Sequence, residues 1–332
     1  MKKVLIVGGA GYIGSHCVLE MHNAGYEVTV LDNLIYGHKE SLPTEVTFIE
    51  GDISDYDLVV DLLEKNKIEL VMHFAAFAYV GESMAEPLKY YQNNVENTIV
   101  LLRAMQSVGV KQLVFSSSCA TYGVPEKLPI IETTPQTPIN PYGETKLVIE
   151  KLLKSLSEND ALSVIALRYF NAAGASGERE IGEDHDPELH LIPLVIKATQ
   201  ENDFTFRVFG DDYDTSDGTC ERDYIHVSDV AMAHLMAAEK LNNNTGGFSV
   251  YNLGAGTPAS VKNIINLVSE VSKREVRHTI EPRRAGDPPS LYTDYSKAKN
   301  ELGWEPKNSD LATIIQSAYT WHTNNPNGYQ SS

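Results

Sequence analysis

The fold of this chain is decided by the stretch GGAGYIG at residues 8–14. The stretch follows an apolar run at Lys3–Val7, which predicts a first strand, and it opens a helical pattern over Tyr12–Ala24. The N-terminus of such a helix offers N–H donors and the positive end of its dipole. Three glycines permit a tight turn, close approach of the backbone to a pyrophosphate and close packing of the helix, namely Gly8, Gly11 and Gly14. Alone, the stretch could be a merely glycine-rich turn, so its context matters.

Asp32 supplies that context. It ends the expected second strand, Glu27–Leu31, and stands 18 residues after Gly14. An acid at this place hydrogen-bonds the adenosine ribose of a dinucleotide and disfavours a 2′-phosphate. Strand, glycines, helix, strand and acid in this order therefore predict an NAD site rather than an NADP site.

Two further strand ends carry residues that suit a cofactor. Gly51–Ile53 ends the third strand, where a side chain would meet the adenine, but Asp55 as a cap of the next helix explains the turn equally well. Phe74–Ala76 ends the fourth strand. Its small residues either let a cofactor lie close or pack a tight turn, so the sequence leaves both strand ends open.

Short apolar runs alternate with helical patterns along the first half of the chain. Further strands are expected at Val46–Ile49, Leu70–Phe74, Gln112–Ser116 and Leu162–Leu167, and further helices at Leu58–Lys65, at Tyr90–Ser107 and after Tyr142. β-Branched runs separated by helices imply crossover connections and a parallel sheet. The expected fold class is therefore α/β, with a doubly wound, Rossmann-like sheet.

After Asn171 the chain changes character, because glycine, proline and charged turns become frequent. We expect a strand at Phe248–Leu253 that returns to the sheet, and helices at Ser228–Leu241, Val261–Lys273 and Asp310–Trp321. The pattern predicts an NAD-binding domain over residues 1–171. Residues 172–332 are expected to form mainly a smaller α/β substrate lobe, with some segments returning to the first domain. Residues 327–332 are expected to be a frayed tail.

Tyr142 and Lys146 stand four residues apart at the start of a predicted helix, so both side chains lie on one helical face. A free phenol has a pKa near ~10, but a nearby ammonium stabilises the phenolate and lowers that pKa. Tyr142 would then exchange a proton with a substrate hydroxyl while a hydride moves to a nicotinamide. Surface helices often carry such a pair by chance. This pair, however, follows a fifth strand that ends Ser116-Ser117-Ser118, at the sheet edge where ligands bind.

Charge and cysteine usage exclude several classes of partner. The formal net charge is −18, and an acidic surface repels nucleic-acid phosphates and anionic lipids, so we expect neither nucleic acid nor membrane as a partner. No apolar run is long enough to span a bilayer. The cysteines, Cys17, Cys119 and Cys220, are far apart and the N-terminus shows no secretory signal. Both observations favour a reducing compartment, the cytoplasm.

Arginine is distributed unevenly. Residues 1–150 contain only Arg103, whereas the remainder contains eight arginines. Guanidinium groups suit bidentate recognition of phosphate, so the second half is expected to bind a diphosphate, with surface ion pairing as the alternative for individual arginines.

A metal site is not expected. His185, Asp186, Glu188 and His190 are residue types that bind metals, but they stand in an acidic loop and no HExxH helix is present. Gly210–Gly218 is acidic without the spacing of a calcium loop.

Taken in order, these motifs resemble those of the UDP-glucose 4-epimerase family, within the extended short-chain dehydrogenases/reductases. The resemblance covers nearly the whole chain and is carried by Gly8–Ser15, Pro87–Val95, Ser116–Gly123, Asn140–Lys146, Arg168–Gly174, Arg222–Val227 and Arg283–Asp287. It implies inversion at C4 of a UDP-hexose, between UDP-glucose and UDP-galactose, through a transient 4-keto sugar with tightly bound NAD. It also implies a homodimer that pairs through the helices at Tyr90–Ser107 and Tyr142–Ser157.

The resemblance further assigns roles to single residues. Tyr142 would be the base, Ser118 would hydrogen-bond the sugar hydroxyl, and Lys146 would tune Tyr142 and hold the nicotinamide ribose. Further contacts to NAD are implied for Gly8, Gly11, Tyr12, Ile13, Gly14, Asp32, Asn33, Asp52, Ile53, Phe74, Ala75, Ala76, Asn93 and Phe170. Contacts to the UDP-sugar are implied for Ser118, Asn171, His190, Leu191, Phe209, Arg222, Arg284, Asp287 and Leu291. Ser116 and Ser117 are expected to cap the end of their strand instead.

Three positions depart from the pattern of the family. Ala78 stands where members often have lysine, and His190 stands where some have asparagine. Leu291 stands where tyrosine restricts the pocket in some members. Because leucine is shorter, we expect some activity on UDP-N-acetylhexosamines.

Two other functions stay open at this point. A nucleotide-sugar dehydratase should carry an acid beside Ser118, but Cys119 and Ala120 follow it. A non-enzymatic NAD-sensing protein need not keep Tyr142 and Lys146.

Overall fold

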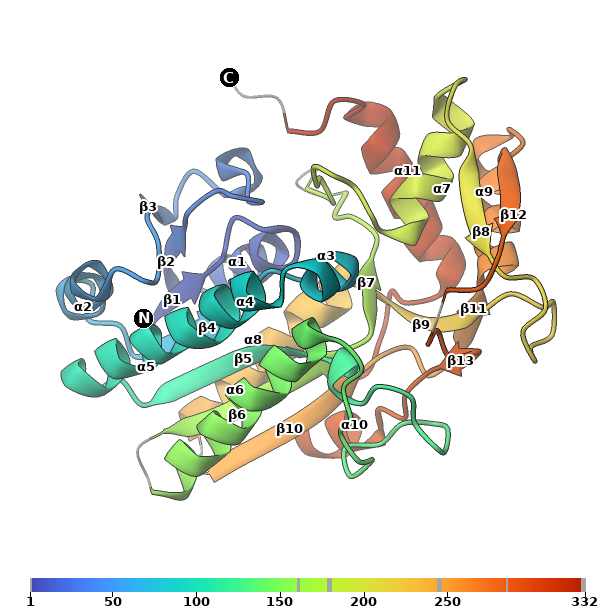
Figure 1. Cartoon of the computed structure of the whole chain (residues 1–332). Helices are drawn as coiled ribbons and strands as arrows, with labels where there is room; N and C mark the ends of the chain where they lie inside the picture. The colour runs from blue at the N-terminus through green and yellow to red at the C-terminus, as the bar shows by residue number, and fades with distance from the viewer. Residues whose placement is uncertain (1, 160–161, 178–180, 244–246, 285, 330–332) are drawn as a thin grey trace.

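The computed structural model describes residues 2–159, 162–177, 181–243, 247–284 and 286–329. Its larger part is a seven-stranded parallel sheet with helices on both faces (Figure 1). The strands lie in the order β10-β6-β5-β4-β1-β2-β3. Their bounds are β1 Lys3–Val7, β2 Glu27–Asp32, β3 Thr47–Glu50, β4 Leu70–His73, β5 Gln112–Ser118, β6 Ser163–Tyr169 and β10 Gly247–Leu253. The sheet confirms the expected α/β, doubly wound fold.

The order of the strands reverses at β1, which lies between β2 and β4. From β1 the chain builds outward through β2 to β3 and then returns to the other side of β1 with β4. Such a reversal opens a crevice at the carboxyl ends of the neighbouring strands, where doubly wound sheets bind their ligands. Gly8 directly follows β1 and Phe74 directly follows β4, so the glycine turn stands at this crevice.

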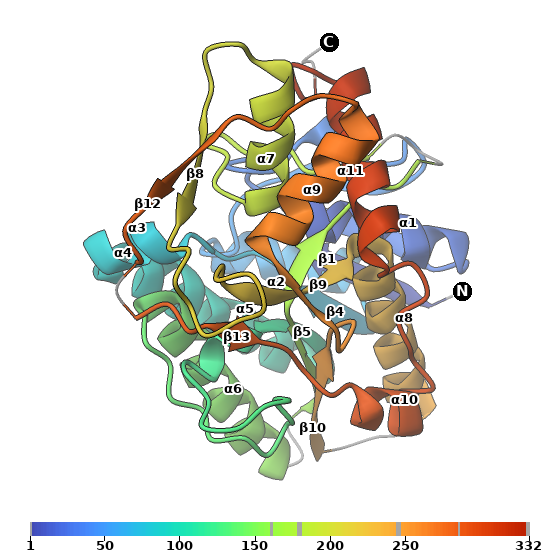
Figure 2. The ribbon, with the colours of Figure 1, turned by 90° about the vertical axis from the view of Figure 1, so that its right-hand side faces the viewer.

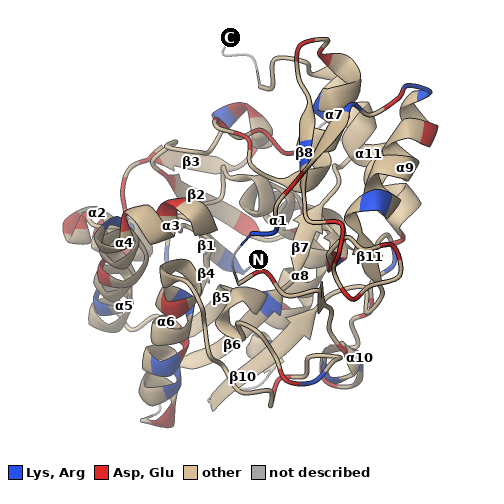
Figure 3. Ribbon diagram, turned by 45° about the vertical axis from the view of Figure 1, so that its right-hand side comes forward, with Lys and Arg blue, Asp and Glu red and all other residues tan. Residues whose placement is uncertain are grey.

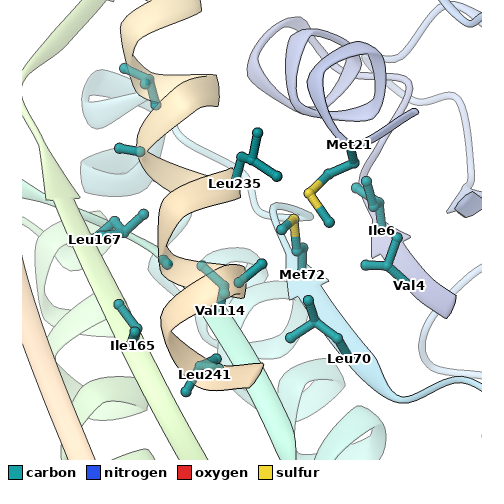
Figure 4. Close-up of a cluster of buried hydrophobic side chains, with 14 of the residues drawn as sticks. Val4, Ile6, Met21, Leu70, Met72, Val114, Ile165, Leu167, Leu235 and Leu241 are labelled. Carbon is teal, nitrogen blue, oxygen red and sulfur yellow. The ribbon is translucent and has the colours of Figure 1, made fainter. Parts of the chain in front are cut away.

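Successive side chains of a β-strand point to opposite faces of the sheet, so neighbouring residues of one strand pack into different hydrophobic clusters. Val4 and Ile6 of β1 belong to one buried cluster, whereas Leu5 and Val7 belong to another. Figure 4 shows the first cluster, in which α1 and α8 meet the sheet. The second cluster lies under α2, α5 and α6. The helices of this part are α1 Tyr12–Asn23, α2 Tyr56–Lys65, α3 Val80–Ala85, α4 Pro87–Tyr90, α5 Asn97–Val108, α6 Pro141–Glu158, α8 Val227–Asn243 and α10 Ser296–Leu302.

Side chains that cap the first turn explain where two of these helices begin. The Asp55 carboxylate accepts a hydrogen bond from the backbone N–H of Leu58 at the start of α2, so this acid is a helix cap. Asn140 accepts from the backbone N–H of Gly143 at the start of α6, and Pro141 occupies the first position of that helix. A cap of this kind stabilises a helix by about 1 kcal/mol. At α6 the cap also sets the position of Tyr142, which comes next in the helix.

The remaining elements form a smaller lobe beside the sheet (Figures 1 and 2). A second sheet runs β11-β9-β13, with β7 paired to β9, and β8 pairs with β12. Helices α7, α9 and α11 pack around a third buried cluster that includes Val195, Ile264 and Ile314. The bounds are β7 Asn171–Ala173, α7 Leu191–Gln200, β8 Phe206–Phe209, β9 Glu221–His226, β11 Pro258–Ser260, α9 Val261–Ser272, β12 His278–Glu281, β13 Ser290–Leu291 and α11 Leu311–Asn324.

The sequence analysis missed several short elements, among them α3 and α10 in the larger part and most of the strands of the smaller lobe. It predicted neither α7 nor the strands β8, β9 and β12, because the strands have only four to six residues and α7 is a ten-residue helix that opens on a run of apolar residues. The expected strand near residues 248–253 is present and lies at the edge of the large sheet beside β6. The expected helix at Tyr90–Ser107 is present, with an unpredicted π-helical segment at Tyr91–Glu96.

The prediction of a frayed tail from residue 327 is wrong for Tyr329. Its ring stacks on His38 at 4.9 Å between ring centres and lies 4.9 Å from the ring of Trp321. Its backbone N–H donates to the Asp184 carboxylate at 2.8 Å. An aromatic ring with these contacts is anchored to the lobe. Residues 330–332 lie outside the described residues.

Charged side chains are distributed over both parts of the molecule (Figure 3). Along α6, for example, Glu144, Glu150 and Glu158 alternate with Lys146, Lys151 and Lys154. Within the described residues, every helix is too short or too polar to cross a membrane.

Candidate active site

A cavity of about 620 Å³ lies between the large sheet and the smaller lobe. Its walls come from the residues that follow β1, β4, β5 and β6, from the start of α6 and α7, and from β9 and the segment before β13. The volume falls in the range of about 300–1,000 Å³ that is usual for cavities binding small molecules. The cavity therefore occupies the crevice that the reversal of strand order predicts.

The glycine turn is packed so tightly that side chains cannot enter it. Gly8 has a φ of +77°, and a Cβ atom there would lie 2.4 Å from the backbone nitrogen of Ala75. A Cβ atom at Gly14 would lie 2.1 Å from the backbone oxygen of Gly8. Such glycines bring the start of α1 against the end of β1, and the first residues of α1 line the cavity, where a helix N-terminus can bind a pyrophosphate.

Asp32 holds the turn from behind. Its carboxylate accepts hydrogen bonds from the backbone N–H groups of Ala10 and Leu34, each at 2.9 Å. Burial raises the pKa of Asp32, and these hydrogen bonds partly offset the rise. Asp52 follows β3 rather than ending it, and accepts a 2.6 Å hydrogen bond from the Asn33 amide. Two candidate adenosine contacts, Asn33 and Asp52, are thus brought together on neighbouring strand ends.

The structure divides the predicted dinucleotide residues into two groups. Those that line the cavity are Gly8, Gly11, Tyr12, Ile13, Gly14, Phe74, Ala76 and Phe170. Those outside its lining are Asp32, Asn33, Asp52, Ile53, Ala75 and Asn93. Asn93 donates to the side chain of Asn94, and Asn94 in turn binds the backbone of Phe77 through both amide atoms. The role of Asn93 toward NAD stays a prediction.

Tyr142 and Lys146 lie on one face of α6, and both line the cavity. The Lys146 ammonium donates to the backbone oxygen of Ser116 at 2.8 Å and lies 5.9 Å from the centre of the Tyr142 ring. Burial lowers the pKa of Lys146 to about 7, although Glu150 opposes the fall. The start of α6 therefore presents a phenol and an amine together at the cavity wall.

The expectation that Lys146 lowers the pKa of Tyr142 is wrong for the protein groups alone. Burial raises the pKa of Tyr142 to about 12, and a hydrogen bond with the Ser118 hydroxyl opposes only part of this rise. The Lys146 ammonium lies 5.9 Å from the centre of the Tyr142 ring and does not outweigh the effect of burial. The charge that activates this phenol must therefore come largely from what binds in the cavity.

The three serines at the end of β5 have separate partners. Ser118 lines the cavity, and its hydroxyl accepts a hydrogen bond from the backbone N–H of Ala120. The expectation that Ser116 and Ser117 cap the strand end is wrong, because β5 continues through both residues. Ser116 bonds the Tyr169 hydroxyl at 2.5 Å, and Ser117 donates to the Glu150 carboxylate at 2.5 Å.

Glu150 and Arg168 form a buried ion pair behind these serines. Both side chains are 4% exposed, and two guanidinium nitrogens donate to the two carboxylate oxygens at 2.9 and 2.5 Å. A third guanidinium nitrogen donates to the Tyr122 hydroxyl at 2.7 Å, which donates to Asn252 of β10. The pair therefore connects α6, β5, β6 and β10 behind the residues that face the cavity.

The opposite wall carries most residues predicted to bind a UDP-sugar. Asn171, His190, Leu191, Arg222, Arg284, Asp287 and Leu291 all line the cavity. Arg222 pairs with Asp287 at 2.6 Å, so β9 and the segment before β13 meet there. Phe209 lies outside the cavity lining, but the Arg284 guanidinium lies over its ring at 4.0 Å. Phe209 thus helps to orient Arg284, a residue predicted to bind the diphosphate. Its own contact with uracil stays a prediction.

Sequence reasoning missed several residues of the cavity. Tyr36 and Tyr79 lie 5.3 Å apart between ring centres, and both line the cavity. Asp223, between the cavity-lining residues Arg222 and Tyr224, is buried and lies outside the lining itself. Its buried carboxylate accepts hydrogen bonds from the backbone N–H groups of Ala255, Gly256 and Thr293. Its place next to Arg222 in the matched segment Arg222–Val227 was the one signal available in the sequence.

The sequence profile of the NAD dependent epimerase/dehydratase family matches residues 4–254, and the chain belongs to this family. Within it, the chain is similar to proteins named UDP-glucose 4-epimerase. That of Lactobacillus helveticus is 49% identical over 328 residues, which cover 99% of each chain.

Two solved structures add ligands and substrates to the comparison. The UDP-glucose 4-epimerase of Bifidobacterium longum, solved in complex with NAD+ and UDP, is 38% identical with a TM-score of 0.93, over 99% of this chain and 100% of that one. The UDP-Glc/GlcNAc 4-epimerase of Campylobacter jejuni is 41% identical with a TM-score of 0.85, over 98% of this chain and 100% of that one.

Proposed function

We propose that this protein is an NAD-dependent enzyme that interconverts UDP-glucose and UDP-galactose by inverting C4 of the hexose. The observation that carries the proposal is the single cavity wall on which Tyr142, Lys146 and Ser118 stand, opposite Arg222, Arg284 and Asn171. One wall offers the groups that move a proton, and the other offers the groups that hold a diphosphate. Full-length similarity to the epimerases described above supports the same reaction.

The residues of the first wall fit NAD. The glycine turn leaves room for a pyrophosphate at the start of α1, and Asp32, at the end of β2, disfavours a 2′-phosphate. When bound, NAD would supply a positively charged nicotinamide that can accept the C4 hydride and give it back. Residues 1–171 are proposed to hold this cofactor, and residues 172–332 mainly the UDP-sugar.

In the proposed reaction Tyr142 accepts the proton of the O4 hydroxyl while Ser118 hydrogen-bonds the same oxygen. Positive charge from the bound cofactor would lower the pKa of Tyr142 from its value of about 12 in the protein alone, and Lys146 would hold the nicotinamide ribose. Arg222 and Arg284 hold the diphosphate throughout, and Asp287 holds the uridine ribose. The sugar ring can then turn over in the cavity while its UDP stays in place, and Tyr142 returns the proton.

Product analysis tests this function. The purified protein is incubated with UDP-galactose, UDP-glucose and the two N-acetylated forms, and the epimers are separated by chromatography. We expect each hexose to give its C4 epimer with no net consumption of NAD. Release of water with formation of a 4-keto-6-deoxy sugar would indicate a dehydratase instead. NAD binding without turnover of any substrate would indicate a non-enzymatic NAD-sensing protein instead.

Leu291 is proposed to set the tolerance for substituents at C2. It lines the cavity and packs with a small buried cluster that includes Tyr122 and Phe170. Its side chain is shorter than tyrosine, and so we expect measurable activity on UDP-N-acetylglucosamine. Leu291→Tyr should lower kcat/KM for the N-acetylated substrate at least ~10-fold, because a clash of this kind costs about 1–3 kcal/mol. The activity on UDP-glucose should change less than ~3-fold.

The matched control for this substitution is Leu291→Met, which conserves volume and should leave both activities close to wild type. If the wild type turns over UDP-glucose but gives no product from UDP-N-acetylglucosamine, the proposed role of Leu291 is wrong.

We also propose a homodimer in the cytoplasm. Apolar side chains are exposed on α3, α4 and the helical stretch that follows, at Val80, Met84, Leu88, Tyr91 and Ile99. Leu88 is 83% exposed, and such a group of apolar residues on a folded surface is typical of an interface. All three cysteines are free, which suits a reducing compartment.

A further inference from the structure

The loop that leads into α7 brings together four side chains that can bind a metal, although the sequence pattern argued against one. Glu183, His185, Glu188 and His190 each offer one ligand atom, and these atoms all lie within 4.8 Å of one another. We call these four residues the His–Glu cluster. The sequence analysis overlooked Glu183 and included Asp186, which is not a member of the cluster.

The contacts within the cluster centre on the nitrogen atoms of two imidazoles. His190 Nδ1 lies 2.7 Å from a Glu183 oxygen and 2.9 Å from a Glu188 oxygen. His185 Nδ1 lies 3.3 Å from Glu183 and 3.6 Å from Glu188. The His185 nitrogen is shielded from solvent, and it has no hydrogen-bond partner among the described residues. The His185 nitrogen thus faces both carboxylates at ion-pair distance, an arrangement that needs a positive charge, from a proton or from a metal ion, between the three groups.

The surroundings hold the cluster in place. The Glu183 side chain is only 5% exposed, and its backbone oxygen accepts a hydrogen bond from the Trp321 indole. The next residue, Asp184, is held by Tyr329 and His38. The rings of Tyr12 and Tyr79 each lie 6.2 Å from the His185 ring. Ligands on a loop that is anchored in this way are preorganised, which a specific metal site requires.

We propose that the His–Glu cluster binds one Zn²⁺ ion. Two imidazole nitrogens and two carboxylate oxygens form a donor set that zinc prefers, whereas Ca²⁺ and Mg²⁺ prefer sites made of oxygen alone. With four ligands from the protein the coordination sphere is complete, so the ion has a structural role. Glu183, His185 and His190 also line the cavity, and metal binding by His190 would replace the contact to the UDP-sugar that the sequence predicted for it.

The position of the cluster indicates what the ion stabilises. His190 is the residue before the first turn of α7, and the next residues, Leu191, Ile192 and Pro193, line the cavity. A zinc ion at the cluster therefore fixes the start of α7 where the substrate wall begins. The loop and α7 carry no other covalent or metal link within the described residues.

The rival interpretation is that protons occupy the cluster. Burial alone would lower the pKa of His185, but the adjacent Glu183 and Glu188 carboxylates raise it to about 9. The two histidines would then be imidazolium ions paired with two carboxylates. Zinc needs the free imidazole nitrogens, so it must displace these protons when it binds.

Metal analysis of the full-length protein distinguishes the two interpretations. Protein without an affinity tag is stripped with a chelator, dialysed with Zn²⁺ and then against metal-free buffer, and analysed by mass spectrometry for bound metal. We expect about one zinc per chain and a rise in melting temperature with Zn²⁺ but not with Mg²⁺. Co²⁺ in place of Zn²⁺ should give the visible absorption of a tetrahedral site. Less than about 0.1 zinc per chain would overturn the proposal.

Two variants and a matched control locate the ion. His185→Gln and Glu188→Gln should each lower bound zinc to below about 0.2 per chain, because each removes one of four ligands. His38→Gln removes another histidine that contacts the same loop, through Asp184, and should retain zinc. Unchanged zinc in His185→Gln, or equal loss in His38→Gln, would place the ion elsewhere and refute the site. The Co²⁺ spectrum of the wild type decides the question if a variant fails to fold.

Discussion

Tyr142→Phe should abolish epimerisation while leaving the folded protein and its NAD content unchanged. Removal of a positioned acid–base group lowers turnover by about 10²–10⁴-fold, and the phenol is the group proposed to exchange a proton with O4. The ring is buried and keeps its packing in phenylalanine, so the fold should not change. Turnover of UDP-galactose, the NAD content of the denatured protein and circular dichroism measure the three expectations.

Tyr79→Phe is the matched control for this substitution. Tyr79 lines the same cavity, and its hydroxyl donates to the backbone oxygen of Pro187 at 3.2 Å rather than facing a proposed reacting atom. We expect its turnover to stay within about fivefold of wild type. Tyr142→Phe with more than about a tenth of the wild-type turnover would refute the role of the phenol as the base.

Arg168→Met should destabilise the protein by about 3–5 kcal/mol, because it leaves the Glu150 carboxylate buried without its partner. Glu150 would keep only the hydrogen bonds from Ser117 and Gln136. Urea unfolding, followed by fluorescence, measures the loss. Turnover should fall less than in Tyr142→Phe, since Arg168 lines no part of the cavity.

Two controls separate the buried charge from other effects of the substitution. The double variant with Glu150→Met should recover at least half of the lost stability, because no uncompensated charge stays behind. Lys65→Met removes an ion pair of similar length, with Asp61 at 2.6 Å, but both side chains are well exposed. That variant should lose less than about 1 kcal/mol. Equal losses in Lys65→Met and Arg168→Met would show that burial of the pair is unimportant.

The sequence predicted the parts of the site that depend on local pattern. Gly8 and Gly14 could be recognised because the turn they make excludes any side chain, and this constraint shows in the sequence itself. Residues four apart lie on the same face of any helix, so the spacing of Tyr142 and Lys146 was enough to predict that their side chains lie together. The large sheet was equally predictable, because each of its strands is a short apolar run between helices.

The parts that could not be predicted depend on residues far apart in the chain. In the sequence Glu150 resembles an ordinary polar residue of an amphipathic helix. Only the fold shows that it is buried in an ion pair with Arg168. In the sequence Asp223 resembles an ordinary charged residue of a strand. Only the fold shows that its carboxylate accepts hydrogen bonds from three backbone N–H groups of two other segments. The pKa of Tyr142 was expected to fall because spacing shows the nearby lysine, whereas burial, which decides the shift, appears only in the fold.

The place of β10 has a consequence for how the protein is made. Residues 163–169 of β6 pair with residues 247–253 of β10, and the segment between them contributes much of the smaller lobe. On a ribosome, β6 emerges long before its outer neighbour, and until then its edge is free to pair with another chain. The half that is proposed to hold NAD cannot complete its sheet as a separate fragment. The smaller lobe is built partly from the segment between these two strands and partly from residues after β10, so it cannot be exchanged as one continuous segment.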